Sequence, residues 1–75
     1  MSIIDERAAK RGHPRGNHER IAALWSAYLG TNVRPHDVAA MMILLKMARA
    51  RVGVDEDNWI DAVGYAEIGR MLQCE

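Results

Sequence analysis

Two carboxylates at helical spacing are the residues of this chain best placed to do chemistry. Asp57 and Asp61 stand four residues apart, so a helix carries both on one face. The preceding apolar segment carries Lys46 and Arg49. Carboxylates can hold a divalent cation such as Mg²⁺, and a Lys/Arg pair can hold phosphate oxygens. The same four side chains can instead form ion pairs between two helices. The sequence favours ion pairing and leaves the cation site open.

A basic segment with two glycines spans residues 11–20. Glycine-rich loops that open helices can cradle phosphates through backbone N–H groups. No established phosphate-loop spacing is present here. A solvated basic loop, a phosphate- or nucleotide-binding arm and a protein-binding loop therefore remain as alternatives. The residues that would bind the phosphate or the partner are Arg11, Arg15, Asn17 and Arg20.

Other reactive residues match no catalytic pattern. His13 and His18, even with His36 or Cys74, do not have the spacing of a zinc site. Ser26 stands in the middle of an expected helix, without the strand–turn–helix elbow of a serine nucleophile. We therefore expect no catalytic residues. The sequence establishes no cofactor, and Mg²⁺ is the one that the carboxylate pair would suit.

Charge is balanced overall but divided along the chain. Residues 1–54 carry nine Lys/Arg and four Asp/Glu, which gives a net charge of +5. Residues 55–75 carry one Lys/Arg and six Asp/Glu, which gives a net charge of −5. Overall neutrality disfavours non-specific nucleic-acid binding, which needs a surplus of cations. The single cysteine, Cys74, fits a reducing compartment. No apolar run approaches the roughly 18 residues of a membrane span. These features predict a soluble cytoplasmic protein with no membrane contact.

Apolar periodicity and capping residues predict an all-α fold. We expect a compact bundle of three main helices plus a short N-terminal helix, with residues 1–75 as a single domain. Residues 1–16 would form an arm and loop, and residues 17–75 the helical core. Asn17 should cap the second helix, Gly30 should end it in the left-handed conformation, and Pro35 should begin the third. The expected helices cover residues 3–10, 18–29, 35–51 and, after the cap at Asp55, about 56–73.

The expected third helix is apolar on almost every side, which predicts a central buried position. Three other helices cannot easily cover such a helix, so we expect a homo-oligomer. The large aromatic residues Trp25, Tyr28 and Trp59 fall on apolar stripes and are expected in the core or in a subunit interface. Gly64, inside the fourth helix, predicts a close approach of two helix backbones.

Several strings of residues resemble a family of small proteins from tailed phages and prophages. They are residues 11–22, 24–30, 35–38, 42–49 and 57–66; the first, second and last of these begin Arg-Gly-His-Pro, Leu-Trp-Ser-Ala and Asp-Asn-Trp-Ile. That family is distantly similar to the all-α nucleoside-triphosphate pyrophosphatases of the MazG type, which are oligomers that hold magnesium on paired acidic residues. The resemblance implies a metal role for Asp57 and Asp61. The Glu-x-x-Glu helix of those enzymes has no counterpart, because Glu19 stands alone.

The resemblance and the incomplete acidic set together predict a phage accessory protein rather than an enzyme. It would bind a host protein or a nucleotide signal, in counter-defence or host take-over, in the cytoplasm of an infected or lysogenic bacterial host. One alternative is a reduced MazG-like, magnesium-dependent nucleoside-triphosphate pyrophosphatase. The other is a nucleic-acid-binding module that uses the basic N-terminal arm.

Overall fold

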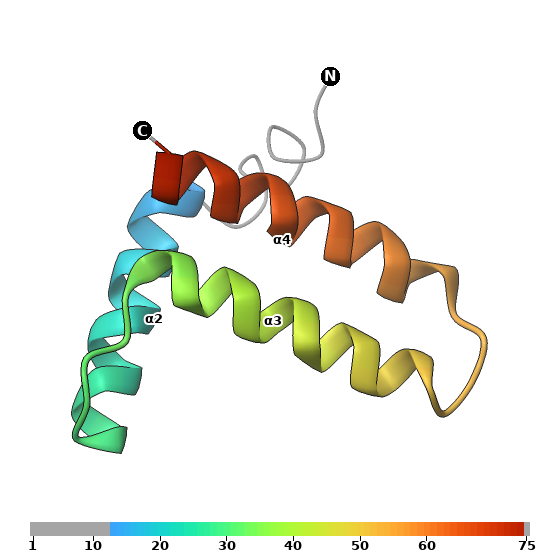
Figure 1. Cartoon of the computed structure of the whole chain (residues 1–75), viewed down its shortest axis with the longest axis horizontal. Helices are drawn as coiled ribbons and strands as arrows, with labels where there is room; N and C mark the ends of the chain where they lie inside the picture. Colours follow the sequence, from blue (N-terminus) through green and yellow to red (C-terminus); the bar gives the residue numbers. More distant parts are fainter. Residues whose placement is uncertain (1–12, 75) are drawn as a thin grey trace.

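Three helices make up the described part of the chain. The computed structural model describes residues 13–74, with α2 at Pro14–Leu29, α3 at Pro35–Ala50 and α4 at Glu56–Cys74. Helices α3 and α4 lie side by side as an antiparallel hairpin (Figure 1). Helix α2 crosses this hairpin at the end where α3 begins and α4 ends (Figure 1). The all-α prediction is confirmed, and the expected helix over residues 3–10 lies outside the described residues.

The start of α2 differs from the prediction. The helix begins at Pro14 rather than after Asn17, so residues 14–16 are helical and not part of a loop. His13 is the N-cap, and its Nδ1 accepts a hydrogen bond from the Arg15 amide at 3.2 Å. Proline suits the first position of a helix because its missing N–H would be unpaired there in any case. The Asn17 amide instead donates to the His13 carbonyl within the first turn, at 3.2 Å.

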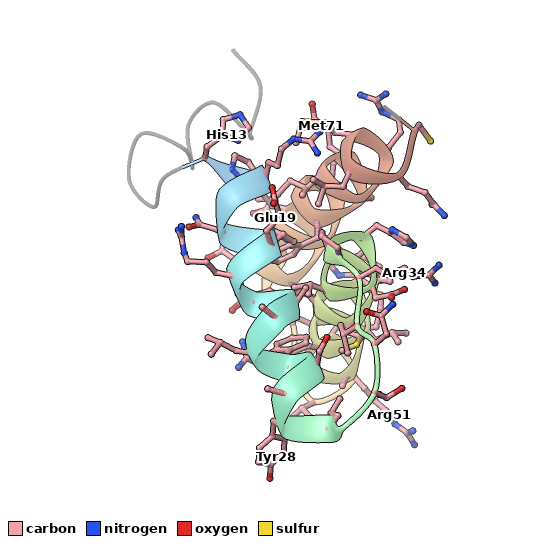
Figure 2. The ribbon with its side chains drawn as sticks, turned by 90° about the vertical axis from the view of Figure 1, so that its left-hand side faces the viewer. His13, Glu19, Tyr28, Arg34, Arg51 and Met71 are labelled. Atoms are coloured by element: carbon pink, nitrogen blue, oxygen red, sulfur yellow. The ribbon has the colours of Figure 1, made fainter. Side chains whose placement is uncertain are left out.

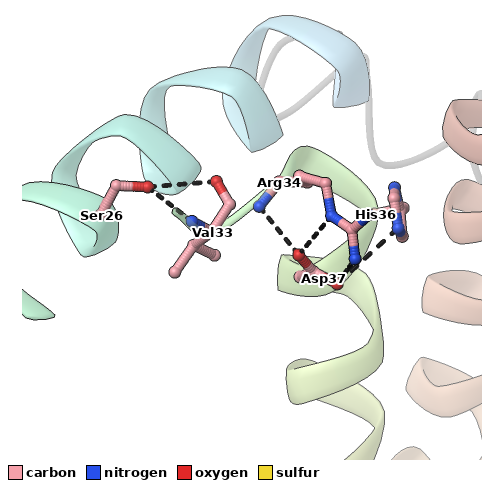
Figure 3. A network of polar contacts seen from close by, with 5 residues as sticks. All are labelled: Ser26, Val33, Arg34, His36 and Asp37. Carbon is pink, nitrogen blue, oxygen red and sulfur yellow. Dashed lines mark hydrogen bonds and ion pairs between the residues drawn. The ribbon is translucent and has the colours of Figure 1, made fainter. Parts of the chain in front are cut away.

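The connection between α2 and α3 is fixed by short-range hydrogen bonds. Gly30 ends α2 with φ 70°, as predicted, and its amide donates to the Ser26 carbonyl at 2.9 Å. The Ser26 hydroxyl accepts from the Val33 amide at 2.8 Å and donates to the Val33 carbonyl at 3.1 Å (Figure 3). Both backbone groups of Val33 are thus satisfied by one side chain, which holds the connector against α2.

Helix α3 begins at Pro35, as predicted, with an acidic side chain in its first turn. Asp37 accepts from the Arg34 amide at 2.9 Å and from the Arg34 Nε at 3.1 Å (Figure 3). These hydrogen bonds lower the pKa of Asp37, and those from the Arg34 side chain contribute more than the one from its backbone. The carboxylate therefore stays ionised where the positive end of the helix dipole favours it.

Helix α4 is capped by Asp55, as predicted, because Oδ1 of this residue accepts from the Asp57 amide at 3.0 Å. Gly64 is buried. A close approach of α3 and α4 occurs at Gly69, where an added Cβ would lie 3.3 Å from the Cβ of Ala39. The sequence thus predicted a close helix contact on α4 but did not identify Gly69 as a site of it.

The core of the described part is small. Its buried apolar residues are Ala22, Val38, Ala39 and Ile68. Helix α3 lies between the other two, as expected for a central helix, but within the single chain it is not fully covered, because Leu44 and Leu45 are exposed. Tyr28 and Trp59 are exposed in the single chain and therefore not in its core, so for these two aromatics the subunit interface stays the prediction. No helix among residues 13–74 is long and apolar enough to cross a membrane.

Candidate functional site

The four charged residues singled out from the sequence gather at the turn between α3 and α4. Lys46, Arg49, Asp57 and Asp61 all line an open cavity of about 590 Å³. The Lys46 Nζ lies 2.8 Å from Oδ2 of Asp61, and these side chains are only 13% and 16% exposed. The structure therefore contains an ion pair between α3 and α4, as the ion-pairing interpretation of these residues requires.

The other two charges of this group are nearer to solvent. Asp57 and Arg49 are both exposed. Within residues 13–74, no group of three or more His, Cys, Asp or Glu side chains is arranged to hold a metal ion. A cation bound by Asp57 and Asp61 would have to compete with the Lys46 ammonium for the Asp61 carboxylate. Magnesium at this pair stays a prediction.

Asn58 is a residue of this cavity that the sequence did not indicate. It lines the cavity and is only 7% exposed. Its backbone amide donates to the Asp55 carbonyl at 3.1 Å, which fixes it in the first turn of α4. Asparagine is common near the start of a helix, where it acts as a capping residue. Its presence at position 58 therefore did not predict that it would be buried.

A second cavity, of about 410 Å³, lies where the three helices meet. Apolar side chains from all three helices dominate its wall. Its polar residues include Asn17 and Arg20, and Arg20 is exposed, which places it on the solvent side. The Arg20 Nη2 donates to Oδ1 of Asn17 at 2.6 Å. The cavity is lined by Pro14, His18, Ile21 and Leu24 of α2, Val38 and Met42 of α3, and Tyr65 and Ile68 of α4, with Asn17 and Arg20.

His18 is the buried titratable group of this cavity. It is 5% exposed, and its Nδ1 donates to the Pro14 carbonyl at 2.9 Å, because a carbonyl oxygen can only accept. The Nε2 atom is buried and has no hydrogen-bond partner in the described part. The Tyr65 ring lies beside it, with centroids 6.2 Å apart. Burial lowers the pKa of His18, and the bond to Pro14 offsets this only in part. The folded protein therefore holds this histidine in its neutral form.

The residues predicted to bind phosphate or a partner fall into two separate groups. Lys46 and Arg49 lie at the turn end of the hairpin, whereas α2 crosses the opposite end (Figure 1). Asn17 and Arg20 lie together on α2, and Arg15 is half-buried one turn earlier. Arg11 lies outside the described residues. The structure therefore does not unite the basic segment with the Lys46–Arg49 pair.

The exposed end of α2 adds apolar surface beside the second cavity. Figure 2 shows Tyr28 at the far end of α2, with its side chain pointing away from the other helices. Leu24 and Leu29 of the same helix are exposed as well. The cavity and this surface are neighbours, because Leu24 belongs to both.

Comparison with known proteins places this chain in a family. The chain is 47% identical over 73 residues to the Gene 55 protein of Mycobacterium phage L5, which covers 95% of this chain and 47% of that protein. It is 45% identical over 65 residues to the Gene 55 protein of Mycobacterium phage D29, covering 85% of this chain and 43% of that protein. The chain thus spans less than half the length of these curated relatives.

No solved structure matches the chain. The phage resemblance expected from the sequence is confirmed, whereas the similarity to MazG-type enzymes stays a prediction. A family model described as "Domain of unknown function (DUF6378)" matches residues 1–73, which is nearly the whole chain. The chain therefore belongs to the DUF6378 family and is related to proteins of two mycobacteriophages.

Proposed function

We propose that this phage protein acts without catalysis, by binding a protein of its bacterial host through the apolar cavity beside α2. The observation that carries the proposal is the cavity of about 410 Å³, whose apolar wall continues into the exposed Leu24. Protein interfaces derive most of their affinity from a few large side chains that fill such pockets. The partner would insert an aromatic or aliphatic side chain, and the outcome for the host would be counter-defence or take-over.

Charge at the mouth of the cavity defines the partner further. Arg20 is exposed there, and the bond to Asn17 holds its guanidinium in place. A guanidinium held in this way can pair with a carboxylate of the partner. The binding segment would therefore carry an acidic residue next to its apolar anchor. Complementary charge of this kind raises the association rate and the specificity of a complex.

The test compares two variants with matched apolar positions. Leu24→Glu places a charge at the cavity, and Ile60→Glu places one on the exposed surface of α4. Purified wild-type protein and both variants would be used to capture proteins from host lysate. The proposal requires a host protein that wild type and Ile60→Glu retain and Leu24→Glu loses, with Kd for the purified partner weakened at least tenfold. Equal capture by all three proteins would contradict it.

A second candidate is a phosphate-bearing ligand, such as a nucleotide, at the cavity between α3 and α4. It is supported by the exposed Arg49 and by Lys46, which both line that cavity. A ligand at 100 times its Kd should stabilise the protein by about 2.7 kcal/mol, which thermal denaturation detects easily. We expect this stabilisation to be lost in Arg49→Ala and to be kept in Arg20→Ala.

The same measurement separates nucleotide binding from the pyrophosphatase alternative. Nucleotides would be added with and without magnesium, and pyrophosphate release would be followed in parallel. Stabilisation that needs magnesium, with turnover that Asp57→Asn abolishes, would support the enzyme and contradict our proposal of a non-catalytic protein. Stabilisation without magnesium and without turnover would support a nucleotide-binding role.

A further inference from the structure

Helix α2 covers only one side of the α3–α4 hairpin. Val38 of α3 is fully buried, and it lines the cavity under α2 together with Met42. Ile68 of α4 lines the same cavity and is also buried. These three residues mark the covered side of each helix. At about 100° per residue, the residues on the opposite side of α3 and α4 follow from the sequence.

On α3, the uncovered side is a continuous apolar stripe. Ala40, Ile43, Leu44 and Met47 stand about 120–180° around the helix from Val38. Their spacing of three, four and seven residues is that of a helix face that packs against another helix. None of them is buried, and Leu44 is 67% exposed.

On α4, the uncovered side is also apolar, but its residues are smaller. Trp59, Ala62, Val63 and Ala66 stand about 120–180° from Ile68, at the three- and four-residue intervals of a coiled-coil seam, and the exposed Arg70 follows one turn later. None of these residues is buried. Alanine at two successive positions allows another helix to approach closely. The two stripes lie on the same side of the hairpin, because α2 packs against the other side of both helices.

We infer that this uncovered face, consisting of residues 40, 43, 44 and 47 of α3 and 59, 62, 63 and 66 of α4, binds a second copy of the chain. The two hairpins would form a four-helix bundle about a two-fold axis along the hairpin. In that arrangement α3 of each copy lies against α4 of its partner, so the larger side chains of Leu44 and Met47 meet the alanines of α4. This inference is independent of the host-protein proposal, which concerns the side covered by α2.

Size and charge both fit a second copy. A 16-residue helix is roughly 24 Å long and its neighbour lies about 8–10 Å away. The corrugated face of such a hairpin is of the order of the ~800 Å² per partner that a stable complex buries. The α3 stripe ends near the exposed Arg51, and α4 begins after the exposed Asp55. The two-fold arrangement places Arg51 of each copy opposite Asp55 of the other copy, so opposite charges meet.

The small core explains why a second copy would be needed. Apart from Pro14, only four apolar residues are buried in the described part of the chain. A domain of this size has little stability to spare, and oligomerisation is one of the usual remedies. Burying the uncovered face would at once cover Leu44 and Trp59, two of the larger exposed apolar residues.

Sedimentation velocity on the full chain tests the inference. The chain has a mass of 8.4 kDa, so a dimer has twice 8.4, or 16.8 kDa. Wild type at tens of micromolar should sediment as the dimer. Leu44→Glu should be a monomer at the same concentration, because the dimer would bury two unpaired charges, and its dimer Kd should rise at least 100-fold. Leu24→Glu is the matched control, since Leu24 is 70% exposed, and it should remain a dimer.

A second variant guards against failure of Leu44→Glu to fold. Ala66→Glu introduces a good helix former at an exposed position of the α4 stripe and should also give a monomer. Helical content, measured by far-UV circular dichroism, should match wild type in at least one of the two monomeric variants. A monomeric wild type, or a dimer that persists in folded Leu44→Glu and Ala66→Glu, would overturn the inference.

Discussion

At the residue scale, the ion pair between Lys46 and Asp61 separates the structural from the metal-binding interpretation. Both side chains are largely buried, at 13% and 16% exposed. Asp61→Asn removes one charge and leaves the Lys46 ammonium in this environment without its partner. We expect a loss of about 1–3 kcal/mol in the free energy of unfolding. For a domain of this size the melting temperature should fall on the order of 5–15 °C.

Asp57→Asn is the matched control for this measurement. Asp57 lies one helical turn earlier and is exposed, so its replacement should change the melting temperature little. A metal site would behave differently, since both substitutions would leave the apo protein stable and abolish stabilisation by magnesium. Thermal denaturation of both variants, with and without Mg²⁺, therefore decides between the two interpretations.

His18 should make stability depend on pH in the weakly acidic range. Burial lowers its pKa in the folded protein, so the unfolded chain takes up the proton first as the pH falls. Stability should therefore be complete above about pH 6.5. It should decline as the pH falls below that value and level off once the folded state is protonated as well. The proton would enter at Nε2, which has no acceptor among the described residues.

His18→Asn tests the source of this pH dependence. Its amide can still donate to the Pro14 carbonyl but does not titrate. The variant should be less stable than wild type at pH 7.5, because it leaves space in the cavity. Its melting temperature should change less than that of wild type between pH 7.5 and 5.5. An unchanged slope would mean that another group is responsible, and His36→Gln is the control that measures one such contribution.

At the scale of the elements, the helix ends were predictable where a single residue type dictates the backbone. Gly30, Pro35 and Asp55 stand where the sequence placed them, because each favours one terminal conformation. The start of α2 was missed because two signals compete there. Asn17 is a strong capping residue, but Pro14 can begin a helix three residues earlier once His13 supplies the cap. Local propensity does not rank such alternatives.

The connector between α2 and α3 depends on one hydroxyl. Ser26→Ala leaves both the amide and the carbonyl of Val33 without their partner, in a part-buried position. We expect a loss of about 1–2 kcal/mol in the free energy of unfolding, measured by urea denaturation. Ser26→Thr keeps the hydroxyl and should recover most of this loss. Equal destabilisation by both substitutions would show that the hydroxyl contributes little.

At the scale of the whole molecule, contacts between residues were easier to predict from the sequence than the burial of residues. The contact between Lys46 and Asp61 was predictable, because the helical periodicity places these residues on the facing sides of two antiparallel helices. The exposure of Leu44 and Trp59 could not be foreseen, because an apolar stripe has the same pattern whether it faces its own chain or another one. Asn58 escaped prediction for a related reason, since its burial depends on how α3 and α4 dock.

The dimer inferred here makes stability depend on protein concentration. Folding coupled to association gains about 1.4 kcal/mol per tenfold increase in concentration. The melting temperature of wild type should therefore rise by several degrees between about 2 and 200 µM. Leu44→Glu should melt at a temperature that does not change over this range. A constant melting temperature for wild type would mean that folding and association are not coupled.

The way α2 is attached has a consequence for local opening. Its buried residues, Pro14, His18 and Ala22, all lie in its first nine positions, and none of the residues that follow them in α2 is buried. The hairpin, in contrast, is joined along the length of both helices (Figure 1). Amide hydrogens of α2 should therefore exchange with solvent through a partial unfolding that leaves α3 and α4 protected. A bound partner at the cavity would slow exchange throughout α2, which makes this helix the natural reporter of occupancy.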